Sequence, residues 1–283
     1  MIWRCAVLLL ALAGLSGCST GTRLAYQNLD TLVRMELGRH VDLDPAQQQL
    51  LQAEFATLWS WHRRSELPAY AQALRSTADQ VERGTLDRPA VDAIANTIRA
   101  SAERLVTQAL PGLASLLASL DEAQVAELLA SQKKSFDEAL RPFEDETAAE
   151  SLQRLTDEAE ERLENWIGPL TPIQHALLVQ RISEAQARGE FVRARLQNEA
   201  IEDQRAFAAL LATRREPALA DRIQALLFPQ DAATQAEWSI RRERSRRFYT
   251  SLAETLTPTQ RAHFAKRLRR YADDASALAA KVP

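Results

Sequence analysis

Residues 61–70 read WHRRSELPAY and place two aromatic rings, three cationic side chains and one carboxylate within ten positions. Aromatic faces beside cations suit stacking on sugar rings and pairing with acidic head groups. Three residues of the earlier segment 26–30 lie close in sequence and could join the same surface. The candidate binding residues are therefore Tyr26, Asn28, Asp30, Trp61, His62, Arg63, Glu66 and Tyr70.

The same stretch also has a purely structural explanation. Pro68 pushes the residue before it out of α geometry and is well suited to the first turn of a helix, so the stretch predicts a corner between two helices. The aromatic rings would fill the elbow, and Arg63 could interact with the last carbonyls of the first helix. The sequence leaves both interpretations open, because a packed corner can still present an outer binding face.

Sequence motifs for catalysis are missing. The chain has no GxSxG, HExxH or GxxxxGK[ST] motif, and its four histidines do not have the spacing of metal ligands. The pair Glu150-Ser151 is similar to the catalytic glutamate of helical peptidoglycan-cleaving enzymes, but a glutamate on an amphipathic helix is usually a surface residue. We expect a protein without catalysis, metal or cofactor, and keep a peptidoglycan-acting enzyme as a remote alternative.

The N-terminus has the layout of a bacterial lipoprotein signal. Arg4 precedes ten small and apolar residues, which is too short a run to span a bilayer. The following Leu15-Ser16-Gly17-Cys18 resembles the lipobox. The resemblance implies a signal peptide over residues 1–17, acylation of Cys18 with palmitate-like chains, and a short lipidated tether over residues 18–21.

The residue that follows Cys18 indicates to which membrane the lipoprotein would be sorted. Ser19, rather than an aspartate, resembles the sorting signal for the periplasmic face of the outer membrane in a Gram-negative bacterium. The mature chain would then keep Cys18 as its only cysteine, which excludes disulfides and thiol chemistry. The expected partners are the membrane, reached through the anchor, and an envelope protein or an anionic lipid or glycan. Nucleic acid is not expected.

Composition predicts an all-α fold. Ala, Leu, Gln, Glu and Arg dominate, only eight glycines occur, and no convincing alternation of apolar residues is present. We expect about ten helices in one domain over residues 22–283, packed as successive antiparallel hairpins in an irregular bundle or a short superhelical array, with a possible boundary near 110–120. The predicted segments are 22–38, 45–65, 68–83, 88–109, 121–141, 144–166, 172–188, 190–215, 217–228, 232–254 and 258–279.

Four helix starts share one pattern, in which a leucine is followed by a capping residue and then, three positions later, by a glutamine. They are Leu43-Asp44-Pro45-Ala46-Gln47, Leu120-Asp121-Glu122-Ala123-Gln124, Leu170-Thr171-Pro172-Ile173-Gln174 and Leu256-Thr257-Pro258-Thr259-Gln260. A capping residue with glutamine at the third helical position predicts a capping box. The pattern fits either a helix start used repeatedly or duplicated helical hairpins.

Charge is unevenly distributed. Residues 120–165 hold fourteen acidic and five basic side chains, whereas residues 241–270 hold ten basic and two acidic ones. One interpretation is that the basic helices pack near the acidic one, or that both faces are solvated. The alternative is a cationic face for lipopolysaccharide, phospholipid head groups or acidic partners.

Two groups of short motifs resemble those of known families. Tyr26-x-Asn28-Leu29-Asp30, Trp61-His62-x-x-x-Glu66-Leu67-Pro68-x-Tyr70 and Arg162-x-x-x-Trp166-x-Gly168 are similar to segments of a family of uncharacterised helical proteobacterial lipoproteins. Leu170-Thr171-x-x-Gln174 and Leu256-Thr257-x-x-Gln260 resemble, more weakly, a motif of small periplasmic helical chaperones. The first resemblance implies lipoprotein status and a helical fold, and it adds no catalytic residues. On the whole sequence we expect a non-catalytic envelope lipoprotein that binds or chaperones a periplasmic or outer-membrane component, or alternatively an assembly accessory of an envelope complex.

Overall fold

The computed structural model describes residues 19–143, 146–190 and 193–280, and the secondary structure of these residues is helical without a strand. The predicted all-α fold is confirmed. The chain forms two compact units, each assembled from three segments. Unit 1 comprises residues 1–64, 102–141 and 196–230; unit 2 comprises residues 65–101, 142–195 and 231–283. Because the segments interleave, no single cut in the sequence separates the units.

The helices match most of the predicted segments within a few residues. Those of unit 1 are α2 (Ser19–Gln27), α3 (Leu29–Leu37), α4 (Pro45–Trp61), α7 (Glu122–Leu140), α10 (Arg193–Ala212) and α11 (Leu219–Leu227). Those of unit 2 are α5 (Leu67–Arg83), α8 (Ala148–Ile167), α9 (Pro172–Ala187), α12 (Ala232–Glu254) and α13 (Pro258–Ala279). Helix α6 (Arg88–Ser119) contributes to both units.

The corner predicted at Pro68 is not a break in the helix. A π-helical turn, η1 (His62–Glu66), joins α4 directly to α5, so helical structure continues from Pro45 to Arg83. Proline cannot donate the usual helical hydrogen bond, and a widened turn just before it is a common way for a helix to continue past this defect. The prediction of a helix end at residues 65–68 was therefore wrong.

Two other boundaries also differ from the prediction. Helix α6 continues through Pro111 to Ser119, although the predicted segment 88–109 ends before this proline. The segment 22–38, expected as one helix, is divided between α2 and α3 at Asn28, whose backbone has φ −106° and ψ 18°. In both places a local residue pattern predicted the wrong boundary, because tertiary packing decides whether a helix tolerates a local defect.

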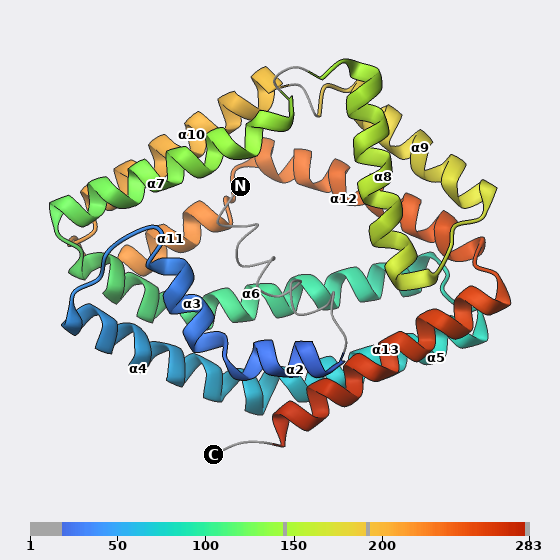
Figure 1. Ribbon diagram of the computed structural model, residues 1–283, viewed down its shortest axis with the longest axis horizontal. Helices are drawn as coiled ribbons and strands as arrows, with labels where there is room; N and C mark the ends of the chain where they lie inside the picture. Colours follow the sequence, from blue (N-terminus) through green and yellow to red (C-terminus); the bar gives the residue numbers. More distant parts are fainter. Residues whose placement is uncertain (1–18, 144–145, 191–192, 281–283) are drawn as a thin grey trace. The chain divides into compact units, whose positions relative to one another are not determined.

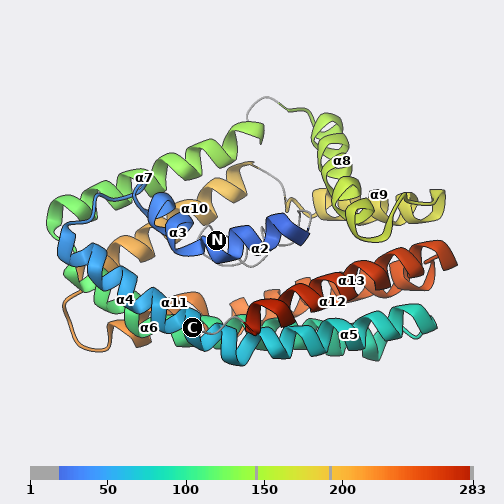
Figure 2. The same cartoon turned by 60° about the horizontal axis from the view of Figure 1, so that its bottom comes forward.

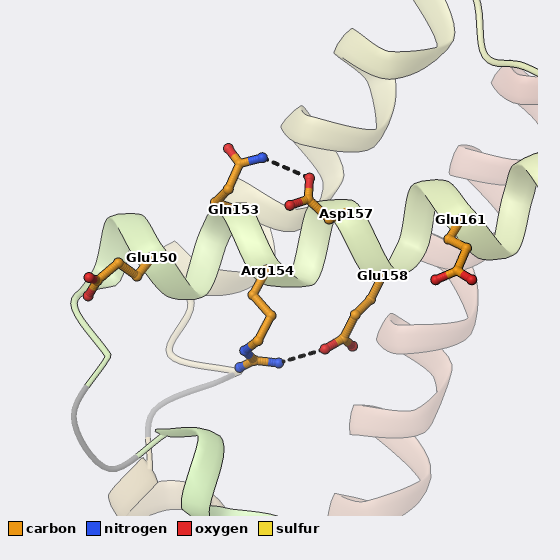
Figure 3. A pocket seen from close by; sticks show the side chains of 6 residues that line it. All are labelled: Glu150, Gln153, Arg154, Asp157, Glu158 and Glu161. Carbon is orange, nitrogen blue, oxygen red and sulfur yellow. Dashed lines mark hydrogen bonds and ion pairs between the residues drawn. The ribbon is translucent and has the colours of Figure 1, made fainter.

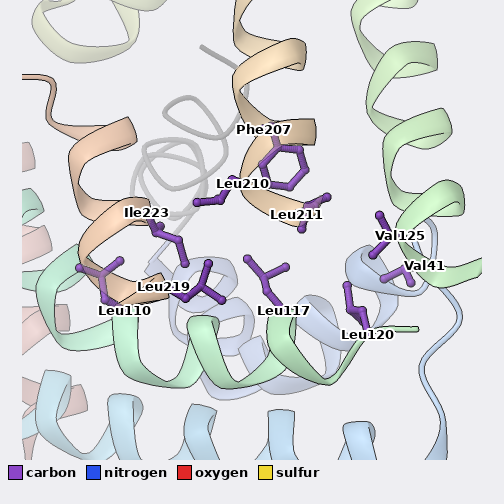
Figure 4. Packing of buried hydrophobic residues seen from close by; sticks show 10 residues of the cluster. All are labelled: Val41, Leu110, Leu117, Leu120, Val125, Phe207, Leu210, Leu211, Leu219 and Ile223. Carbon is purple, nitrogen blue, oxygen red and sulfur yellow. The ribbon is translucent and has the colours of Figure 1, made fainter. Parts of the chain in front are cut away.

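The core of unit 1 gathers apolar side chains from α6, α7, α10 and α11, and Val41, which precedes α4, lies at one edge of it beside Val125 and Leu120 (Figure 4). Leu120, Leu211 and Val41 are at most 1% exposed, and no buried member of the cluster is more than 8% exposed. The buried members are Val41, Leu110, Leu117, Leu120, Val125, Phe207, Leu210, Leu211, Leu219 and Ile223. Leu37, at the end of α3, packs against the same cluster and so connects the N-terminal helices to the core.

Unit 2 is built on the close pairing of α5 with α13, which lie side by side in both views (Figure 1, Figure 2). Alanines make this approach possible, because Ala78, Ala265 and Ala272 are completely buried. Arg269 ties the helices together at the surface through ion pairs with Asp79 and Glu82. A second cluster of unit 2, formed by Ile167, Leu252 and Leu256, links the ends of α8 and α12.

All four predicted capping boxes are present, at the starts of α4, α7, α9 and α13. In unit 2, Gln174 and Gln260 lie face to face, and the side-chain amide of each donates to the side-chain oxygen of the other, at 2.9 and 2.8 Å. Each amide also donates to a backbone carbonyl of the opposite turn, that of Thr255 or Pro169. A single side chain thus caps its own helix and joins two helical hairpins.

Unit 1 repeats this arrangement with Gln47 and Gln124, whose amides exchange hydrogen bonds of 2.8 and 2.7 Å. Their second donors bind the carbonyls of Ser119 and Asp42. The four helix starts that share the leucine, capping residue and glutamine pattern therefore pair in the structure. The first start contacts the second, and the third contacts the fourth. Both units therefore use the same local geometry to join two helix starts.

Candidate functional site

The N-terminal helix α2 is held by a stack of aromatic rings in unit 1. The Tyr26 hydroxyl lies 2.9 Å from Nδ1 of His62 in a hydrogen bond. The His62 ring stacks on Trp59 with 5.0 Å between ring centres and 3° between the planes. The ring centres of Trp59 and Tyr26 are 4.1 Å apart. The Arg63 guanidinium lies 5.6 Å from the centre of the Tyr26 ring. We call Tyr26, Trp59, His62 and Arg63 the α2 anchor cluster.

Burial shows that packing is the main task of the α2 anchor cluster. His62 is only 7% exposed, and Tyr26, Trp59 and Arg63 are all partly buried. His62 is also the first residue of the π turn, and π turns inside α-helices are frequent at functional sites. Here the turn places the imidazole against the tyrosine hydroxyl, so that α2 is fixed to the end of α4.

Several of the predicted binding residues lie together in the structure. Tyr26, His62 and Arg63 meet in the cluster, and Trp61 contacts His62 with ring centres 6.4 Å apart. Asn28 donates to the carbonyl of Leu24, and Asp30 pairs with Arg34, so both serve their own helical segment. The last two, Glu66 and Tyr70, belong to unit 2, where Glu66 is buried and Tyr70 partly buried. Cys18 lies outside the described residues.

A hollow that the sequence did not reveal lies between α3, the connection that follows it, and the start of α4. Apolar side chains make up much of its lining, with Val41 completely buried and Met35 59% exposed. Arg34, Asp42 and Gln48 supply polar groups. The lining residues are Thr31, Arg34, Met35, Gly38, Val41, Asp42, Leu43, Gln48 and Leu51. An apolar hollow with a few polar groups is the usual form of a binding site.

The glutamine pair of unit 1 fixes one wall of this α3–α4 hollow. The Asp42 carbonyl accepts a 2.7 Å hydrogen bond from the Gln124 amide, and the Asp42 backbone N–H donates to a Glu127 carboxylate oxygen at 3.0 Å. Both groups of one residue are therefore bound to α7. The connection between α3 and α4 is held in place before any ligand arrives, which lowers the entropic cost of binding.

A second, more open hollow lies on the acidic side of α8 (Figure 3). Its lining comes from one face of a single helix and carries four carboxylates, those of Glu150, Asp157, Glu158 and Glu161. Arg154 bonds Glu158 at 3.0 Å across this face and also makes two hydrogen bonds to Glu146. The described residues contain no group of carboxylates, histidines or cysteines arranged to hold a metal ion. This surface has the features of a solvated helix face.

Glu150 has a structural task at the start of α8. Its carboxylate accepts hydrogen bonds from the backbone N–H and the hydroxyl of Thr147, both at 2.8 Å, in a fifth capping box. These bonds hold the pKa of Glu150 below its usual range. A general acid of a glycosidase needs the opposite, a raised pKa. Ser151, its neighbour, is buried.

The basic residues of α12 and α13 find acidic partners mainly outside the acidic stretch 120–165. Arg244 pairs with Glu190 at 3.0 Å and Arg246 with Asp92 at 3.1 Å. Helix α13 does pack on the acidic helix α8, as one interpretation predicts, but through aromatic contacts of Trp166. Much of the positive charge on 241–270 is therefore used within unit 2.

Comparison with known proteins identifies the family. A model of a family of unknown function, DUF6279, matches residues 39–240 of the 283-residue chain. The chain belongs to this family. The match includes one wall of the α3–α4 hollow and three of the four paired glutamines, and it excludes α2, α3 and α13. No curated protein and no solved structure matches the chain.

Proposed function

We propose that this member of the family is a non-catalytic lipoprotein on the periplasmic face of the outer membrane, and that it binds or chaperones an envelope component. The α3–α4 hollow carries the proposal, because it combines apolar walls, an exposed methionine and a few polar groups. Methionine side chains are flexible and polarizable, and they recur on surfaces that accept varied apolar partners. The favoured ligand is therefore an apolar segment of a protein.

The lipoprotein part of the proposal rests on the sequence. Arg4 and the apolar residues before Leu15-Ser16-Gly17-Cys18 are arranged as in lipoprotein signals, and residues 1–18 lie outside the described part of the chain. Among the described residues, no helix has the length and apolar character needed to cross a bilayer. An acyl anchor at Cys18 would supply membrane attachment by a different route.

Suppression of aggregation tests the binding site in solution. The full mature chain with Cys18→Ser is mixed with an unfolding client protein, and light scattering is followed. We expect suppression by the parent chain, its loss with Met35→Glu, and its retention with Ile173→Glu. Ile173 is the matched control because it is also an apolar, highly exposed helical residue. Equal suppression by the Met35→Glu chain would contradict the assignment of the hollow.

The runner-up, an assembly accessory, predicts a different outcome of the same assay. It would give no general suppression, and instead one discrete and saturable partner in envelope extracts, again lost with Met35→Glu. A peptidoglycan-acting enzyme would instead release soluble muropeptides from purified sacculi. That activity would have to disappear with Glu150→Gln, a change that the capping box tolerates, since the other four capping boxes use glutamine at this position.

A further inference from the structure

Helix α3 carries apolar side chains beyond its partly buried side. Leu29, Val33 and Leu37 recur every four residues and are partly buried, with Leu37 packed on the core of unit 1. Leu32 and Met35, three positions apart, lie on one face and are 44% and 59% exposed. A surface helix with one inward apolar stripe needs no second one. The outer pair therefore points to a surface that covers it.

Helix α2 adds a third exposed apolar residue close to the predicted anchor. Leu24 is 54% exposed, and α2 begins at Ser19, the residue directly after Cys18. If Cys18 carries acyl chains that enter the bilayer, the first turn of α2 starts within one residue of the lipid surface. The α2 anchor cluster then matters, because it fixes α2 to α4 and keeps the helix from swinging freely away from its unit.

We infer that the outer faces of α2 and α3 lie on the membrane surface, with Leu24 and Leu32 inserted among the lipid head groups and Met35 at the mouth of the α3–α4 hollow. The inference rests on the lipoprotein part of the proposed function. It deepens that function, because the α3–α4 hollow shares Met35 with this face and would open at the membrane surface. A ligand would then be taken up where apolar segments of envelope proteins meet the bilayer.

Charge indicates how the face binds lipid. Helices α2 and α3 together carry two cations, Arg23 and Arg34, and two carboxylates, Asp30 and Glu36, so they have no excess of positive charge, and Arg34 pairs with Asp30. Helices that bind by attraction to anionic lipid carry an excess of Lys and Arg. The contact of α2 and α3 is therefore driven by apolar insertion, and we expect it to persist at high salt and without anionic lipid.

Depth measurement on the acylated protein tests the inference. Leu32→Cys, labelled with a nitroxide, is compared with labelled Ile201→Cys, an exposed apolar position of α10 in the same unit. The protein is reconstituted in vesicles of phosphatidylethanolamine and phosphatidylcholine, and collisions with oxygen and with a water-soluble nickel complex are measured. We expect nickel accessibility at position 32 to fall several-fold on vesicle binding, and that at position 201 to stay unchanged.

The failures of this experiment are separable. If the protein does not float with the vesicles at all, the anchor is wrong and the proposed function loses its lipoprotein part, which also overturns the inference. If the protein floats but position 32 stays as accessible to nickel as in solution, the lipid anchor at Cys18 is supported. The inference that the outer faces of α2 and α3 lie on the membrane is then wrong. If shielding occurs only with phosphatidylglycerol present and is lost in concentrated salt, anionic lipid attraction replaces apolar insertion and the inference fails in that form. Far-UV circular dichroism confirms that each labelled variant is folded.

Discussion

At the scale of single residues, Glu150 shows how a local bond pattern decides the role of a side chain. Its carboxylate accepts two hydrogen bonds from Thr147, and these bonds lower its pKa. Because the pKa of Glu150 is lower in the folded state, its carboxylate stabilises the fold at pH values above 4.5, the ordinary pKa of a glutamate. This contribution is lost as the pH falls through the lowered pKa of the folded state. The pair Glu150-Ser151, which suggested catalysis in the sequence, is thus explained by a helix start.

Glu150→Gln should separate charge from capping. The amide oxygen can accept the same bonds, so we expect the variant to fold and to keep α8 intact. We expect it to be slightly less stable than the parent at neutral pH, because a carboxylate suits a helix N-terminus better than an amide. The difference should shrink as the pH is lowered below about 4.5 and then through the depressed pKa of Glu150. Urea unfolding over a series of pH values from neutral to below the depressed pKa measures it; a constant difference would contradict the assignment.

Gly112 shows a second residue whose role comes from tertiary contact. A Cβ placed on Gly112 of α6 would lie 2.8 Å from Cβ of Glu54 on α4, closer than carbon atoms pack. The two helices can approach this closely only without a side chain at position 112. Sequence patterns suggested that Pro111 and Gly112 end a helix, whereas the structure gives Gly112 a role in helix packing.

Gly112→Ala should therefore destabilise unit 1. Alanine favours a helix over glycine by about 1 kcal/mol, but forcing α4 and α6 apart costs roughly 1–3 kcal/mol. We expect a net loss of about 0–2 kcal/mol in the free energy of unfolding, measured by denaturant titration. Ser115→Ala, on an exposed position of the same helix, is the control and should change stability by about 0.5 kcal/mol or less. A more stable Gly112→Ala variant would show that the contact relaxes freely.

At the scale of elements, the paired glutamines are the most specific link between hairpins. Gln174 is completely buried, and its amide and oxygen serve Gln260, Thr255 and the backbone of Thr171. Removing one glutamine leaves buried polar groups of the other turn without partners, which costs about 1–3 kcal/mol per unsatisfied group. The pair should therefore behave as one unit in unfolding experiments.

A double-mutant cycle tests this coupling. We expect Gln174→Ala and Gln260→Ala each to reduce the free energy of unfolding by about 2–3 kcal/mol. The double variant should lose clearly less than the sum, because the second change removes a group that the first left unsatisfied. Gln180→Ala, on the exposed face of α9, is the control and should be nearly neutral. Additive losses would mean that the two amides act independently.

Elements were predictable from the sequence where the signal was local. The starts of α4, α7, α9 and α13 follow from a capping residue and a glutamine three positions later, and all four are correct. The continuation of helices through Pro68 and Pro111 was not predictable from local patterns. A π turn precedes Pro68, and α6 runs through Pro111 where Gly112 lies close to Glu54 of α4. The pairing of the four helix starts also depends on contacts between residues about eighty positions apart.

At the scale of the whole molecule, the sequence and the structure favour different candidate sites. The sequence indicated residues 61–70 at the end of α4, whereas the α3–α4 hollow lies at its start. The aromatic and cationic residues of 61–70 were visible because of their types, and Tyr26, His62 and Arg63 do meet. Because these side chains are buried or partly buried, their main role is to pack α2 against the end of α4. The α3–α4 hollow was not visible, since its lining comes from ordinary residues on two helices and their connection. The one signal in the sequence was the second apolar face of α3, at Leu32 and Met35.

Binding of a partner in the α3–α4 hollow can be tested in living cells by photo-crosslinking from position 35. A photoreactive aromatic residue replaces Met35, with matched replacements at Tyr70 and Ile173 as controls. We expect protein adducts from position 35 alone: one discrete adduct for a dedicated partner, or many for a chaperone. Adducts should also be lost when Leu51, which lines the hollow from α4, is changed to Glu in a folded variant. Adducts from position 70 with none from position 35 would refute binding in the hollow and return the site to residues 61–70.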